Sequence, residues 1–210
     1  MLAVLAFLTG SLAPVLIALT PGAASAGACG TAIPAGTSCT LTGTLGVTAG
    51  SLELTSPSSM TWSETLNGLD QDVVDTTAGD QEYTVSDATG SGAGWHVTMS
   101  ATTFTNGTHT FPNTGTFSTN GSTSSLSATT APTAACSGGT CTLPSNTETY
   151  PVAITTAGTS PTASTIYDTA AGSGLGPVLI SGIGWWLDVP ASAWAGSYTS
   201  TVTMEVVSGP

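Results

Sequence analysis

Lysine and arginine are completely absent from this chain of 210 residues, whereas twelve aspartates and glutamates give it a formal net charge of −12. The only groups that can carry a positive charge are the α-amino group, His96 and His109. Proteins that hold nucleic acid neutralise its phosphates with Lys or Arg, and adhesion to an anionic membrane surface uses a basic patch. The composition therefore excludes both partners, together with arginine-assisted phosphoryl transfer.

Helical spacing is also missing from the sequence, because no stretch repeats apolar residues every 3.6 positions between capping residues. Apolar and polar residues alternate instead, as in 95–100 and 198–206, with Met60, Trp62 and Leu66 on one face of a further expected strand. Glycine-containing turns such as Asn120-Gly121 separate these runs. The pattern predicts an all-β fold, an antiparallel β-sandwich of Ig-like or related topology with little helix. Residues 117–135 are expected to form a long loop or a weak edge strand.

The N-terminal 26 residues have the features of a targeting segment. Residues 1–19 are mostly apolar, and Ala24-Ser25-Ala26 forms a small-residue cleavage pattern, although no positively charged region precedes it. We expect a secretory signal peptide over 1–26 and a single domain over 27–210. The alternative is an uncleaved membrane anchor, against which Pro14 argues by interrupting the apolar stretch.

The four cysteines form two local pairs in the sequence. An even number of cysteines in an exported chain favours disulfides, and four cysteines allow three connectivities. We expect Cys29–Cys39 and Cys136–Cys141, because the turn sequence Ser137–Thr140 would bring the second pair together. A zinc site is the alternative, but the spacings fit it poorly.

Two stretches resemble a known family of surface proteins. In Val85–Ala101 a glycine-rich turn leads into Trp95-His96-Val97, and this stretch resembles the first motif region of the WxL-domain proteins of Gram-positive bacteria; Ala195–Val206 is similar to that family's last strand. Val97 stands where the family has Leu, and Met204 where it has Trp. The resemblance implies non-covalent attachment to peptidoglycan without catalysis, and the change at position 204 puts wall binding in doubt more than the fold.

Aromatic side chains and one histidine are the binding candidates of the sequence. An exposed Trp can stack on a sugar ring or a peptide and donate a hydrogen bond. The candidates are Trp95, His96, Trp185, Trp186 and Trp194. Adjacent Trp185 and Trp186 would point to opposite faces of a strand, so one could be buried and the other exposed. The alternative for the tryptophans is packing in the core or at its edge.

Six of the twelve acidic residues lie between Asp70 and Asp87, and this run suggests either a hydrated face or a cation site. Asp70, Asp72 and Asp75 are weak candidates for Ca²⁺, because a loop could supply the six to eight oxygens that this ion takes. The spacing is not that of an EF-hand. We expect no firm metal site and no cofactor.

No catalytic residues can be named from the sequence, which contains no G-x-S-x-G nucleophile elbow placed between a strand and a helix. We therefore expect a non-enzymatic, secreted protein of the bacterial cell surface or wall that binds a cell-wall polymer or other surface proteins. The second hypothesis is a self-assembling subunit of a surface fibre or layer, in which edge strands add to a neighbour's sheet. The third is a secreted hydrolase, for which His96 would be the residue to test.

Overall fold

The computed structural model describes residues 27–30 and 32–210, so the expected signal peptide lies outside the described residues. The chain divides into two units, residues 1–47 and residues 48–210. No helix in the described part is long and apolar enough to cross a membrane. The described part of the first unit holds two short parallel strands, β1 (Gly27–Ala28) and β2 (Cys39–Thr40), and the disulfide Cys29–Cys39.

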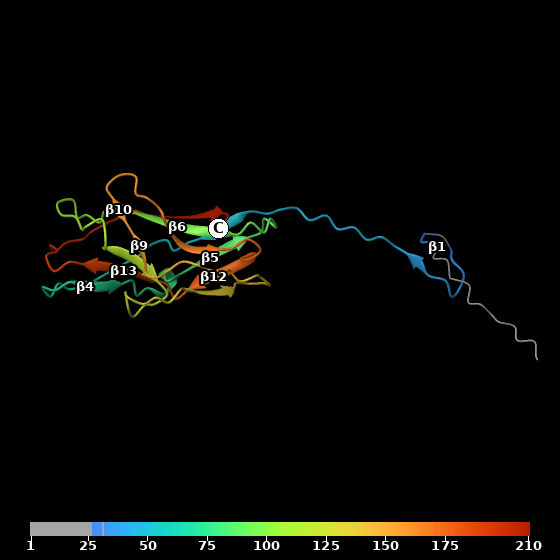
Figure 1. Ribbon diagram of the computed structural model, residues 1–210, viewed down its shortest axis with the longest axis horizontal. Coiled ribbons are helices and arrows are strands. Elements are labelled where there is room, and N and C mark those ends of the chain that lie inside the picture. The colour runs from blue at the N-terminus through green and yellow to red at the C-terminus, as the bar shows by residue number, and fades with distance from the viewer. Residues whose placement is uncertain (1–26, 31) are drawn as a thin grey trace, which may run out of the picture. The chain divides into compact units, whose positions relative to one another are not determined.

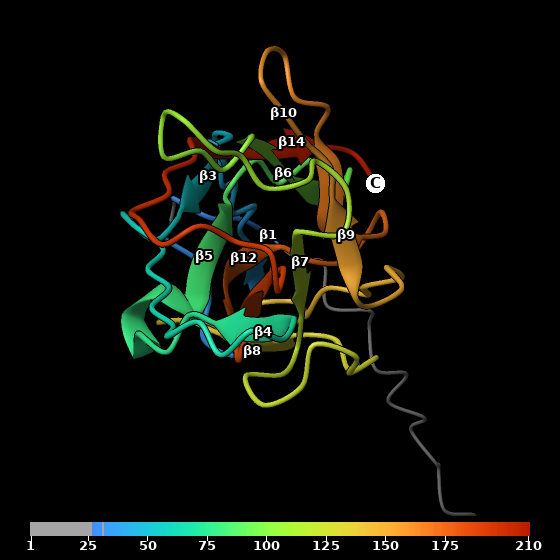
Figure 2. The ribbon, with the colours of Figure 1, turned by 90° about the vertical axis from the view of Figure 1, so that its left-hand side faces the viewer.

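The second unit is built from strands, with a single turn of 3-10 helix, η1 (Ala78–Asp80), among its described residues. It contains three four-stranded sheets (Figures 1 and 2). In the first sheet β6 (Trp95–Thr102) is central. It pairs antiparallel with β14 (Val202–Ser208) and β11 (Ser164–Thr169), and parallel with the short β10 (Thr156–Ala157).

The other two sheets are wholly antiparallel. One has the order β3 (Leu52–Thr55), β5 (Glu82–Asp87), β12 (Gly176–Ser181) and β8 (Thr133–Cys136). The other has the order β4 (Gln71–Val74), β13 (Gly184–Val189), β7 (Phe117–Asn120) and β9 (Val152–Ile154). The disulfide Cys136–Cys141 closes a short loop after β8. Both expected cysteine pairs and the all-β sandwich of antiparallel sheets are therefore confirmed.

The core fills the space between these sheets, and the alternation read from the sequence explains its composition. Along β6 the residues at odd positions are buried, from Trp95 to Ala101, while those between them are partly exposed. Apolar side chains from the other two sheets join them. They include Val85, Phe117, Ile154, Ile180 and Trp185, each at most 1% exposed. Burial of this apolar surface is the main favourable term in folding.

Two expectations about individual segments were wrong. Residues 60–66 form no strand, although Met60 and Trp62 do pack against the core. Residues 117–135 are not only a loop or a weak edge, because β7 lies between β13 and β9 as an inner strand, whereas β8 is indeed an edge strand. In the second case polar residues are buried by hydrogen bonding. Asn120, the last residue of β7, is not exposed to solvent, and its side chain forms hydrogen bonds to the loop that follows.

Candidate binding groove

The second unit contains a groove of about 970 Å³. One wall is the irregular segment 56–66, called the strap here, and another is the loop 193–200. Its floor consists of side chains from three strands and the loops beside them. The main floor residues are Val73, Phe104, Phe111, Leu187, Val202 and Met204. Hydroxyl groups of serine and threonine line both walls.

The strap lies along the groove without pairing to any strand; Nε2 of Gln71 donates to the carbonyl of Thr65 near its end (3.1 Å), and two further contacts hold its middle. The backbone N–H of Thr61 donates to Oδ2 of the buried Asp75 (2.8 Å), and Nε1 of Trp62 donates to the carbonyl of Trp185 (2.9 Å). A second backbone N–H, that of Thr77, occupies Oδ1 of Asp75 (2.8 Å). A buried carboxylate with two charge-assisted bonds from backbone N–H groups is a strong anchor. Asp75 therefore positions the strap, and with it Trp62.

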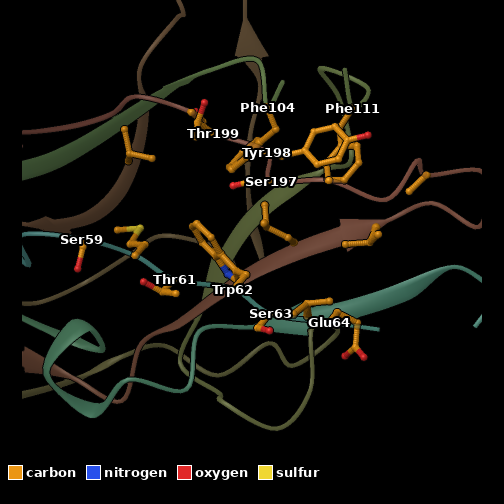
Figure 3. A pocket seen from close by; sticks show the side chains of 18 of the residues that line it. Ser59, Thr61, Trp62, Ser63, Glu64, Phe104, Phe111, Ser197, Tyr198 and Thr199 are labelled. Atoms are coloured by element: carbon orange, nitrogen blue, oxygen red, sulfur yellow. The ribbon is translucent and has the colours of Figure 1, made fainter. Parts of the chain in front are cut away.

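Aromatic rings form one half of the groove. Trp62 meets Phe104 and Phe117 edge to face, with ring centroids 5.9 and 5.8 Å apart. Tyr198 is stacked on Phe111 at 4.2 Å. Figure 3 shows Trp62 at the centre, with Phe104, Phe111 and Tyr198 grouped on one side and Ser63 and Glu64 on the other. The result is an apolar, aromatic surface of fixed shape.

Two sheet edges bound this groove. β14 pairs only with β6, and β4 pairs only with β13, among the strands that the structure describes. The lining of the groove includes Val202 and Met204 of β14 and Val73 of β4. An edge strand presents a row of free backbone N–H and C=O groups, which can pair with an added strand. Apolar side chains and unpaired backbone are thus available at the same place.

The charge of the groove is low and of one sign. Glu64 is the only carboxylate among its lining residues, and no histidine, lysine or arginine lines it. Behind the strap, burial raises the pKa of the Asp80 carboxyl, and the charge of Asp75 raises it further. Burial likewise raises the pKa of Asp188, with added repulsion from Asp72 and Asp70. The groove therefore offers nothing to a polyanion and favours an uncharged partner.

These raised pKa values predict that the protein loses stability as the pH rises. Such a carboxyl has a higher pKa in the folded state than in the unfolded state. At a pH between these two values it keeps its proton only in the folded state, so the folded state binds more protons. The free energy of unfolding therefore falls as the pH rises. We expect the midpoint of urea unfolding to decrease as the pH rises above about 4, the ordinary pKa of an aspartate. Asp80→Asn should flatten this dependence, whereas Glu53→Gln on the exposed edge strand β3 should not. A midpoint that rises over this range would contradict the prediction.

Three of the five binding candidates from the sequence belong to the core. Trp95 and Trp185 are 0% exposed and Trp186 is 4% exposed. Each indole N–H has a partner inside the protein: the carbonyl of Gly174 for Trp95, that of Asp80 for Trp185, and both Asn120 Oδ1 and the Ser122 carbonyl for Trp186. The interpretation of these residues as surface binding residues is therefore corrected, because they present no surface to a partner.

The other two candidates lie apart from each other. His96 is half-buried on β6, where its Nδ1 lies 2.7 Å from the carbonyl of Gly209, and it does not line the groove. Trp194 is 63% exposed at the groove and stacks on the ring of His109, with centroids 4.5 Å apart. Of the sequence candidates, only Trp194 is thus available at the groove.

Two of the three acidic calcium candidates accept hydrogen bonds from the protein, and the third stands opposite another carboxylate. Asp70 accepts a bond from the N–H of Ala191 (2.7 Å), Asp72 stands opposite Asp188 in the register of β4 and β13, and Asp75 is buried beneath the strap. Within the described ranges 27–30 and 32–210, no three His, Cys, Asp or Glu side chains are grouped so that they could hold a metal ion. The acidic run in the sequence suggested that Asp75 could bind a cation, whereas in the structure Asp75 positions the strap.

Sequence reasoning missed Trp62 and Tyr198 as groove residues. The signal for Trp62 was present, since a lone tryptophan lies within a segment of serine, threonine and glutamate. The alternation of Met60, Trp62 and Leu66 was instead assigned to a strand. No protein-family model matches the chain, and no curated protein and no solved structure is significantly similar to it.

Proposed function

We propose that this chain is an exported, non-catalytic protein of the bacterial cell surface, and that its groove holds an extended, uncharged strand of a partner protein. The observation that carries the proposal is the groove itself, whose apolar floor is bounded by unpaired edges of two sheets. The two disulfides indicate an oxidising environment, which supports export.

A β-strand suits this groove better than other partners do. Alternate side chains of a strand point to one side, where the aromatic and aliphatic floor can cover them, while its backbone can bond to an unpaired edge such as that of β14. The hydroxyl groups on the walls can satisfy polar atoms at the rim. Anionic wall polymers are disfavoured, because the net charge of −12 repels them.

Binding rather than catalysis is supported by the positions of the two histidines. The ring of His96 contacts a backbone carbonyl, and that of His109 stacks on Trp194. Neither arrangement places an imidazole against a serine hydroxyl, as acyl transfer would need. A panel of esterase and glycosidase substrates should give no turnover; activity that disappears in His96→Ala would contradict this part of the proposal.

A strand-shaped probe tests the groove directly. The probe is a capped nonapeptide of alternating valine and threonine, and the readout is the indole N–H resonance of Trp62 in ¹⁵N NMR spectra. We expect this resonance to shift and that of the buried Trp95 to stay in place. Ser197→Trp, which fills the groove, should abolish the shift, whereas Thr203→Trp on the opposite face of β14 should preserve it. Equal responses of the two variants would contradict the proposal.

A second candidate function, non-covalent binding of peptidoglycan, is favoured by Trp194 alone. Its indole is 63% exposed and held flat by His109, as a platform for a neutral sugar ring. This candidate continues the WxL resemblance seen in the sequence. The sugar chain would stack on the exposed ring rather than enter the groove between the sheet edges.

If Trp194 is such a platform, Trp194→Ala should reduce retention on purified peptidoglycan roughly tenfold, the worth of one stacking contact. Its stability should change by less than about 0.5 kcal/mol, because the side chain is exposed. Leu143→Ala, another exposed apolar residue outside the groove, is the matched control. Retention equal to that on an inert polymer resin would count against wall binding, with or without a chelator present.

A further inference from the structure

We infer that the strand which occupies the groove is residues 41–47 of a second copy of this chain. The inference rests on the proposed function and names the partner of the same site. Leu41, Leu45 and Val47 are 78%, 87% and 85% exposed, the three highest values among the exposed large apolar side chains of the described residues. Burial of such side chains in a partner is favourable, and a run of them rarely stays uncovered.

The pattern of this segment is that of a strand with one apolar face. Leu41, Leu45 and Val47 occupy every second position together with Gly43, whereas Thr42 and Thr44 lie between them. The segment has no strand assignment, and its backbone makes no hydrogen bond to other backbone within the described part of the chain. Its free N–H and C=O groups are therefore available to a sheet edge.

Electrostatic repulsion limits how two copies of this acidic chain can approach each other. Two molecules that each carry −12 repel each other, and neither has a lysine or arginine to offset this. Residues 27–52 contain no acidic side chain, and their cysteines are joined in a disulfide. The groove contributes only Glu64. Contact between an uncharged segment and a nearly uncharged groove thus adds little to the repulsion between two copies.

The chain that follows the segment joins the second unit near the start of β3. The N–H of Gly50 donates to the carbonyl of Ala88 (2.8 Å), which fixes the chain at the start of β3. The lining of the groove begins at Ser56, after the far end of β3. β3 therefore lies between the segment and the groove-lining strap in the sequence.

Single substitutions on the two faces of the segment test the inference. In the chain 27–210, Leu45→Asp would place a charge in the apolar groove and should weaken self-association at least about 100-fold in sedimentation equilibrium. Thr44→Asp adds the same charge on the opposite face and should change it no more than about threefold. Ser197→Trp should abolish association by blocking the groove that receives the segment. Mixing Leu45→Asp with Ser197→Trp should give a 1:1 complex and nothing larger. In such a mixture only the segment of the Ser197→Trp variant and only the groove of the Leu45→Asp variant can still bind.

The outcomes separate this inference from the proposed function. If Ser197→Trp abolishes the nonapeptide shift of Trp62 but Leu45→Asp associates as the wild type does, the groove binds strands and residues 41–47 are not the occupant. If Ser197→Trp changes neither result, both proposals fail. If the wild type is a monomer in which Leu45→Asp moves the Trp62 resonance, the segment fills its own groove, and the second copy is excluded.

Discussion

Replacing Trp62 by alanine is expected to lower the free energy of unfolding by roughly 3 kcal/mol and to abolish binding of the alternating nonapeptide. The indole makes two edge-to-face contacts, with Phe104 and Phe117, and its N–H bonds the carbonyl of Trp185. Its loss removes the aromatic centre of the groove and one of the hydrogen bonds that hold the middle of the strap. Urea unfolding followed by far-UV circular dichroism measures the first effect, and peptide titration the second.

Trp62→Phe is the matched control for this prediction. A phenyl ring keeps an aromatic side chain against Phe104 and Phe117 but cannot donate to the Trp185 carbonyl, so the cost should be about 1 to 2 kcal/mol. Peptide binding should weaken without disappearing. If phenylalanine were as damaging as alanine, the hydrogen bond rather than the rings would hold the strap, and the aromatic account of the groove would be wrong.

Replacing Asn120 by leucine is expected to cost about 4 kcal/mol, because the side chain bonds a whole loop to the end of β7. Its Nδ2 donates to the carbonyls of Ser125, Leu126 and Ala128 at 2.9, 2.8 and 3.2 Å. Its Oδ1 accepts from the N–H of Ser122 (3.0 Å) and from the indole of Trp186 (3.1 Å). Leucine fills a similar volume but leaves buried polar groups without partners.

Asn67→Leu is the control, since Asn67 is exposed and its side chain accepts only from the N–H of Leu69. This variant should stay within about 0.5 kcal/mol of the wild type. The neighbourhood of Asn120 gives an independent check. A Cβ on Gly184 would lie 2.0 Å from the carbonyl of Ser122, so Gly184→Ala should disturb the same loop. Equal stabilities of Asn67→Leu and Asn120→Leu would refute the role assigned to Asn120.

The alternation of side chains was sufficient to predict the class of fold but not the position of every strand. Residues 95–102 form a strand where the pattern placed one, and the strand expected over 198–206 lies at 202–208; one face of each packs against the core. β7 escaped prediction because Ser118, Thr119 and Asn120 are polar. Asn120 is buried by hydrogen bonds rather than by apolar contact, and a hydropathy pattern does not register such bonds.

The tryptophans show why the site was harder to predict than the fold. Trp185 and Trp186 do belong to one strand, yet both are buried, because β13 is an inner strand and the loop that Asn120 holds covers its second face. Trp62 is held in the groove by its own bond to the Trp185 carbonyl and by Asp75, which bonds the neighbouring Thr61 from fourteen positions away in the sequence. Contacts between distant segments of this kind follow from the packing of sheets, and local spacing carries no signal for them.

The strap has a consequence for the dynamics of the groove. Residues 56–66 make no backbone-to-backbone hydrogen bond with any other part of the chain that the structure describes. Segments of this kind open locally at a small fraction of the free energy needed to unfold the sheets. The amide hydrogens of the strap should therefore exchange with deuterated solvent long before those of β6 or β13, with Thr61 as the slowest of them. Such local opening would let a strand enter sideways, between two sheets that remain fully folded.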